Sequence, residues 1–122
     1  MKDLIPSNWD NLYKSNYIPF QKLRNAKECY ACFQGKVLAL YDSTFWGAAD
    51  DGFCITTDGI WGHNLWEEDI IAFSWDEIDI ITFDSSSILI NNKKITVKED
   101  AMYLASILRK LKNCYDEYFN KK

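Results

Sequence analysis

The feature that most constrains the fold is a change of hydrophobic period just after Gly35. Before this glycine the apolar residues recur at helical spacing. From Lys36 to Val97 they instead form short runs or alternate with polar residues, which is typical of β-strands. The stretch from Val37 to Ile60 predicts two strands and a turn into a third, because Asp58-Gly59 is a hairpin signal whose glycine accepts a positive φ. We therefore expect an antiparallel meander at the centre of the domain.

The whole of the period-two region predicts seven short strands in sequence order. Asp76-Glu77 separates the fourth strand from the fifth, and Asn91-Asn92 suits a type I′ hairpin between the last two. The expected strands are Lys36–Tyr41, Gly52–Thr56, Ile60–His63, Ile70–Trp75, Ile78–Phe83, Ile88–Ile90 and Ile95–Val97.

Helices are expected on both sides of this region. Residues 1–19 form an N-terminal extension with one short helix, which Ser7 would cap and along which Trp9, Leu12, Tyr13 and Tyr17 fall near helical spacing. Residues 20–122 form the domain. It begins with an amphipathic helix over 20–33, which Gly35 closes. A capping box at Thr96 to Glu99 begins a last helix over 98–119. We expect its apolar face to cover an open end of the sheet, through Ala101, Leu104, Ile107, Leu108, Leu111, Tyr115 and Tyr118.

Seven antiparallel strands followed by one C-terminal amphipathic helix resemble a pleckstrin-homology (PH) type barrel. The distinctive residues are similar to the leading motif of the bacterial PH-like, or GRAM-like, domains. They are Val37 to Leu40, Asp42, Thr44, Gly47, Ala49, Asp51-Gly52-Phe53, Thr56 and Asp58-Gly59-Ile60. The resemblance implies an α+β fold, in which a seven-stranded antiparallel barrel or sandwich is capped by a C-terminal helix and preceded by one or two N-terminal helices. It also implies a binding role, since no common catalytic residues come with this family.

Composition narrows the class of partner. The 122 residues suit one domain, and the net charge of −4 disfavours nucleic acid or an anionic membrane surface, both of which need a concentrated cationic face. A protein partner, and specifically a basic one, is the better electrostatic match. We expect no secretion signal and no membrane span, because no segment approaches ~20 consecutive apolar residues. Four scattered cysteines fit a reducing compartment, so we expect the protein to be cytoplasmic.

Residues with chemical potential do not form a recognisable catalytic or metal-binding pattern. Cys29 and Cys32 form a lone CxxC, which we interpret as packing residues; zinc binding or dithiol exchange is the alternative. His63 has no nucleophile signature nearby. The turn from Asp42 to Asp51 holds no basic residue, which disfavours phosphoinositide binding. We therefore predict no enzyme activity, no catalytic residues, no metal and no cofactor.

Aromatic and acidic residues in two predicted loops are the candidate binding residues. These are Phe45, Trp46, Asp50, Asp51, Trp66, Glu67, Glu68 and Asp69. Aromatic loop residues are common interface anchors, although Trp46 and Trp66 would equally well fold back onto the barrel mouth.

The primary functional hypothesis is a non-enzymatic PH-like module. It would bind a protein partner through these loops or through the groove beside the C-terminal helix, where an unpaired strand edge can add a peptide strand. The alternative is an acidic immunity or antitoxin protein that neutralises a cationic toxin. A redox or zinc enzyme using Cys29 and Cys32 is a third hypothesis, and the oligomeric state is left open.

Overall fold

Two antiparallel sheets and two helices make up the described part of the chain. The computed structural model describes residues 4–6, 11–29, 36–43, 51–64, 70–98 and 100–120. The first sheet has five strands in the order β1-β2-β3-β4-β5, and the second has three in the order β6-β7-β8. The strands are β1 (Leu12–Lys14), β2 (Val37–Asp42), β3 (Gly52–Thr56), β4 (Gly59–His63), β5 (Ile70–Ser74), β6 (Ile81–Phe83), β7 (Ser87–Ile90) and β8 (Lys93–Thr96). The helices are α1 (Phe20–Cys29) and α2 (Ala101–Asn120), with 3₁₀ turns at Ser15–Tyr17 and Trp75–Glu77.

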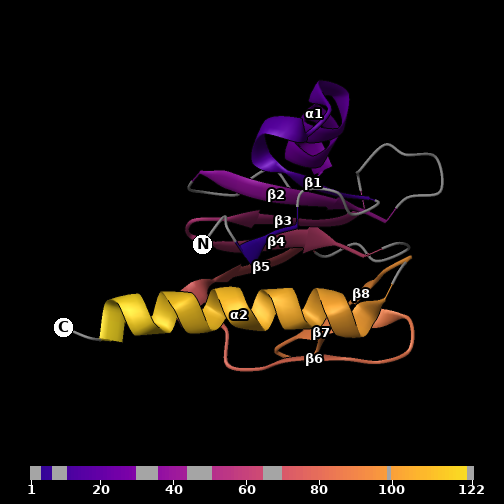
Figure 1. The fold of residues 1–122 in the computed structure, drawn as a ribbon. Coiled ribbons are helices and arrows are strands. Elements are labelled where there is room, and N and C mark those ends of the chain that lie inside the picture. The colour runs from indigo at the N-terminus through magenta and orange to yellow at the C-terminus, as the bar shows by residue number, and fades with distance from the viewer. Residues whose placement is uncertain are drawn as a thin grey trace.

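The first sheet lies between two layers. In Figure 1, α1 lies on one side of this sheet, and α2 lies on the other side together with the second sheet. Every residue of β3 is buried. Cys54 belongs to the cluster that contains Ala26 of α1, whereas Phe53 and Ile55 belong to the cluster that contains residues of α2, so both faces of this strand are covered. Neither helix in the described part of the chain combines the length and the apolar character needed to cross a membrane.

The predicted α+β class, with antiparallel strands and a C-terminal helix, is confirmed, but the closed seven-stranded barrel is not formed. Eight strands occur in the described residues, and none of the first sheet pairs with one of the second. The break lies at Ile78–Ile80, which the sequence pattern assigns to a strand. There the Oδ1 atom of Asn91 accepts hydrogen bonds from the amides of Asp79 (2.8 Å) and Ile80 (3.1 Å), so a side chain takes the place of a neighbouring strand.

The N-terminal extension differs from its prediction. Leu12–Lys14 is not helical but forms β1, which pairs with β2 from Leu12 opposite Tyr41 to Lys14 opposite Ala39. Pairing with β2 leaves Leu12 only 2% exposed. This tertiary contact decides the conformation of the three residues, whose helical spacing is too short a pattern to do so. Ser7 and Trp9 lie outside the described residues.

The first helix of the domain is found from Phe20 to Cys29, and the predicted remainder up to Phe33 lies outside the described residues. Its contact with the sheet is centred on Ala26, which is fully buried, and on Lys22, which pairs with the buried carboxylate of Asp42 on β2. Phe20, the first residue of the helix, is 78% exposed. A partly buried ion pair and the buried Ala26, rather than Phe20, therefore orient α1.

The two predicted hairpins are present, although one has a different cause. Asn91 and Asn92 both have positive φ (49° and 69°), as a type I′ turn requires. The β3–β4 hairpin does not use a positive φ at Gly59, since Gly52 alone among the described glycines has one (132°). A Cβ at Gly59 would instead lie 2.1 Å from the carbonyl oxygen of Phe73 on β5. Glycine is needed there because β5 approaches the backbone closely.

The C-terminal helix packs as predicted except at Tyr118, which is 67% exposed, and it begins later than predicted. Leu104 and Leu111 are 1% and 0% exposed within one core cluster that includes residues of both sheets. The helix begins at Ala101 rather than Lys98, and Asp100 accepts a hydrogen bond from the amide of Tyr103 (3.2 Å). The amide of Lys98, which precedes the helix, donates to the hydroxyl of Tyr41 on β2 (2.9 Å).

Candidate functional site

The loop residues predicted to form a binding site lie almost entirely outside the described residues. These are Phe45, Trp46, Asp50, Trp66, Glu67, Glu68 and Asp69. The eighth, Asp51, is 6% exposed, and its Oδ1 atom lies 2.6 Å from Nδ1 of His63 on the adjacent strand. The carboxylate of Asp51 is thus buried and paired with an imidazole, rather than displayed to a partner.

Two cysteines have described side chains, Cys54 on β3 and Cys114 on α2, and both are free thiols. Cys54 is fully buried, and the loss of hydration raises the pKa of its thiol to about 12. Cys114 on α2 is partly exposed. Cys32 lies outside the described residues, and nothing is described of the Cys29 side chain. Among the described residues, no three potential ligands gather as a metal site would require.

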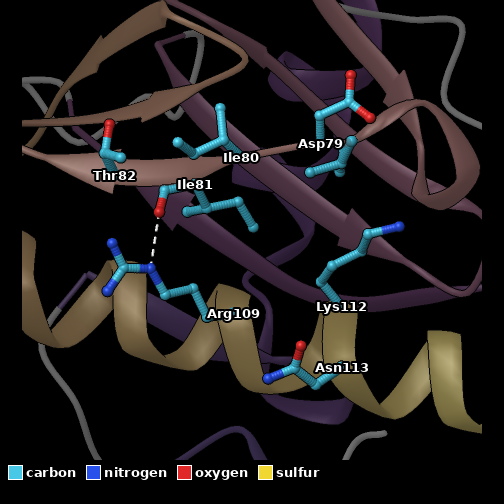
Figure 2. Close-up of a pocket in the computed structure, with 8 residues that line it drawn as sticks. Asp79, Ile80, Ile81, Thr82, Arg109, Lys112 and Asn113 are labelled. Atoms are coloured by element: carbon cyan, nitrogen blue, oxygen red, sulfur yellow. Dashed lines mark hydrogen bonds between the residues drawn. The ribbon is translucent and has the colours of Figure 1, made fainter.

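A groove of about 320 Å³ lies between the start of the second sheet and α2. Figure 2 shows the chain from Asp79 to Thr82 along one side of it, with Arg109, Lys112 and Asn113 of α2 along the other. We call this space, lined by Ile78–Thr82, Arg109, Lys112 and Asn113, the β6–α2 groove. Ile80 is 51% exposed and gives the groove an apolar wall.

The strand that borders the groove is the terminal strand of its sheet. The carbonyl of Ile80 accepts from the amide of Asn91 (2.9 Å), and the amide of Asp84 donates to the carbonyl of Ser87 (2.9 Å). Residues 80 and 84 thus direct their backbone groups towards the hairpin formed by β7 and β8. Because backbone direction alternates along a strand, those of Ile81 and Phe83 point the other way. The open edge of β6 therefore presents Ile81 and Phe83.

The chain that leads into β6 is held by side chains. Asn91 accepts from the amides of Asp79 and Ile80, and its Nδ2 donates to the carbonyl of Glu77 (2.7 Å). The carboxylate of Glu77 accepts from the amide (2.9 Å) and the hydroxyl (3.0 Å) of Ser74. These bonds, chiefly the one from the amide, lower the pKa of Glu77. The side of the groove formed by Ile78–Ile80 is thereby held in place without a neighbouring strand.

Two cations on α2 have different surroundings. Nζ of Lys112 donates to the carbonyl of Trp75 (2.6 Å) and pairs with Asp116 (2.9 Å), so its charge is already compensated. Nε of Arg109 donates to the carbonyl of Ile81 (2.7 Å), which is the dashed line in Figure 2. The Arg109 guanidinium lies 5.8 Å from the ring centre of Phe83, and no carboxylate of the described residues lies within ion-pair distance of it.

The described lining of the groove combines backbone, apolar and charged groups. It has a strand edge, an apolar wall, an arginine and one carboxylate (Asp79), but it includes neither a cysteine nor a histidine. Nucleophilic catalysis needs an activated nucleophile beside an oriented base, and no such pair is found in this lining. An extended peptide, in contrast, needs an open strand edge and alternate side-chain contacts.

Sequence reasoning anticipates a groove beside the C-terminal helix but not its residues. Arg109 falls on the polar side of the α2 periodicity, which predicts a solvated side chain. Asn91 is recognisable from the sequence only as a turn residue. The hairpin signal at Asn91-Asn92 is the available clue, but the bonds from its side chain to the chain before β6 depend on tertiary structure.

Comparison with protein-family models, with curated proteins and with solved structures gives no match for this chain.

Proposed function

We propose that the protein is a non-enzymatic, bacterial PH-like binding module that holds an extended segment of a protein partner in the β6–α2 groove. The observation that carries this proposal is the open edge of β6, which faces a groove bounded by α2. An unpaired strand edge is a template for another strand, and proteins use it to bind peptides.

The order of elements supports the PH-like part of the proposal. Strands β2 to β5 follow one another in the first sheet, β6 to β8 follow one another in the second, and α2 then packs on the shared core. Seven strands followed by a C-terminal helix are the order that the sequence resemblance implies. Strand β1 and helix α1 are additions at the N-terminal side.

The properties of the groove support a peptide rather than a small polar ligand. An added strand would form backbone hydrogen bonds with Ile81 and Phe83, and its alternate side chains would contact Ile80 on one side and α2 on the other. A volume of about 320 Å³ has room for a few side chains, while the remainder of the segment would extend along the surface.

The loop end of the domain is the less well supported location. Its candidate residues other than Asp51 lie outside the described part of the chain, and the Asp51 carboxylate is already paired with His63. The immunity or antitoxin hypothesis depends on the net charge of −4, which does not locate a binding surface. We therefore base the proposal on the groove.

A proline on the edge of β6 tests the proposal. Phe83→Pro removes an amide that points away from β7 and blocks strand addition, whereas the hydrogen bonds between β6 and β7 remain. Phe83→Ala is the matched control, since it removes the same ring and keeps the amide. Each variant and the wild type would be immobilised and exposed to a lysate of the source organism, and the captured proteins would be quantified by mass spectrometry.

We expect at least one protein to be captured by the wild type and by Phe83→Ala but not by Phe83→Pro. Circular dichroism would verify that both variants are folded. If every captured protein bound Phe83→Pro as well as it bound Phe83→Ala, strand addition at β6 would be ruled out as the binding mode.

A further inference from the structure

We infer that Arg109 selects partner segments that carry an aspartate or glutamate side chain at one fixed position. This inference rests on the proposed function and adds the chemistry of the bound segment. It assigns to Arg109 a role as a specificity-determining residue of the β6–α2 groove.

The first argument is the bonding of the guanidinium. An arginine has five N–H donors in a planar fork that fits a carboxylate with two parallel hydrogen bonds. Nε of Arg109 donates to the carbonyl of Ile81, and Arg109 is an exposed residue. No carboxylate of the described residues forms an ion pair with it, so the charge of its guanidinium lacks a compensating carboxylate among them.

The second argument is that Arg109 occupies a position that an added strand would need. The Ile81 carbonyl points away from β7, and an incoming strand would bring an amide to it. Binding would therefore exchange one donor for another at this carbonyl and release Nε of Arg109. A carboxylate on the bound segment offers the guanidinium a replacement partner of opposite charge, whereas a neutral side chain leaves it without one.

The charges around the groove limit where the acidic side chain can lie. Lys112 is paired with Asp116, so Arg109 is the cation in the described lining whose charge lacks a compensating carboxylate. Asp79 lines the same groove and would repel a carboxylate placed beside it. The acidic side chain is therefore expected beside Arg109, near Phe83. This position would fix the register in which the bound segment pairs with β6.

This local requirement differs from the prediction based on net charge. The chain has a net charge of −4, which favours a basic partner. A partner can be basic as a whole and still carry one carboxylate in the segment that enters the groove. Close contacts decide the specificity of the segment, while net charge acts mainly on the rate of encounter.

Selection from a random 12-residue peptide library displayed on phage tests the inference and does not require an identified partner. The library would be selected on the wild type and on Arg109→Gln, whose amide can still donate to the Ile81 carbonyl. Lys110→Gln is the matched control, because it removes the same charge from a neighbouring exposed residue that does not line the groove. Circular dichroism and thermal unfolding would verify the fold of each variant.

We expect peptides selected on the wild type to share an aspartate or glutamate at one position and to bind Phe83→Ala but not Phe83→Pro. Replacing that residue by asparagine or glutamine should weaken binding to the wild type and to Lys110→Gln about three- to tenfold, as for a partly exposed arginine–carboxylate pair. The same replacement in the peptide should not change its affinity for Arg109→Gln. Synthetic peptides with amidated C-termini would separate a side-chain carboxylate from a terminal one.

The possible results separate this inference from the function on which it rests. Groove-dependent peptides without a shared acidic residue, or with an acidic preference that persists in Arg109→Gln, would overturn the role of Arg109 and leave the groove proposal intact. A preference that disappears when the C-terminus is amidated would also overturn it. If no selected peptide distinguished Phe83→Ala from Phe83→Pro, the proposed function itself would be contradicted.

Discussion

Gly59 lies against the backbone of β5, where a Cβ would be 2.1 Å from the carbonyl oxygen of Phe73. The Asp58-Gly59 hairpin is present, but Gly59 is required by the nearby carbonyl of Phe73 rather than by a positive φ. The sequence shows which residues form a turn, whereas the approach of β5 to that turn is a tertiary contact between distant segments. No local pattern could have distinguished the two causes.

Substitution at Gly59 distinguishes the two causes experimentally. Gly59→Ala should lower the free energy of unfolding by roughly 3 kcal/mol, because its Cβ would force the β4 and β5 backbones apart. Gly59→Asn should be at least as destabilising, although asparagine tolerates positive φ. Urea denaturation of both variants measures the effect. A markedly milder loss for asparagine than for alanine would restore the positive-φ explanation.

The Cys54 thiol should be inert in the native protein. Its pKa of about 12 leaves about one thiolate in ten thousand at pH 8, and the side chain is also closed to reagents. Alkylation by iodoacetamide, resolved by mass spectrometry of peptides, should therefore label Cys54 only after unfolding. The partly exposed Cys114 serves as the internal control and should react first. Labelling of native Cys54 at the rate of Cys114 would contradict this burial.

At the scale of elements, prediction succeeded where the pattern was long or the turn chemistry specific. The periodicity of α2 continues over twenty residues, and Asn91-Asn92 has few alternatives to a type I′ turn. Prediction failed at β1, because three residues carry too little pattern and pairing with β2 decides their state. It also failed at Ile78–Ile80, where alternating apolar and polar residues suggested a strand, but the amides of Asp79 and Ile80 donate to the Asn91 side chain instead.

Asn91, in the hairpin between β7 and β8, is expected to stabilise the side of the β6–α2 groove formed by Ile78–Ile80. Asn91→Gly keeps the positive φ of the turn but removes three side-chain hydrogen bonds to residues 77–80, so it should cost about 1–3 kcal/mol of stability. Asn92→Gly, the matched control, should change stability by less than about 0.5 kcal/mol, since glycine accepts the same φ.

Amide hydrogen exchange provides the local measurement for this pair. Exchange at Asp79 and Ile80 should become faster in Asn91→Gly and remain unchanged in Asn92→Gly. Equal exchange in both variants would mean that Asn91 acts only as a turn residue and does not position the groove.

At the scale of the molecule, the sheets are separate in hydrogen bonding but joined in their packing. One core cluster includes residues of both sheets and of α2. Trp75 lies at their junction: its Nε1 donates to the carbonyl of Thr56 on β3 (3.1 Å), its carbonyl accepts from Lys112, and its ring stacks on Tyr115 at 6.3 Å. Most candidate residues of the predicted loop site lie outside the described residues. The β6–α2 groove is formed by the packing of α2 against the second sheet, and no sequence motif marks its lining residues.

We therefore expect both sheets and α2 to unfold in a single cooperative transition, with Trp75 as the main connection. Trp75→Phe leaves the buried carbonyl of Thr56 without its donor and creates a cavity, which should lower the free energy of unfolding by about 2–4 kcal/mol. The slowest-exchanging amides of β3 and of β7 should report the same loss, because one shared core holds them. Tyr115→Phe, which removes only the bond to Asp76 at 3.0 Å, should cost less than about 1 kcal/mol. A loss confined to β7 and α2, with β3 unchanged, would show instead that the second sheet and its helix form an independent unit.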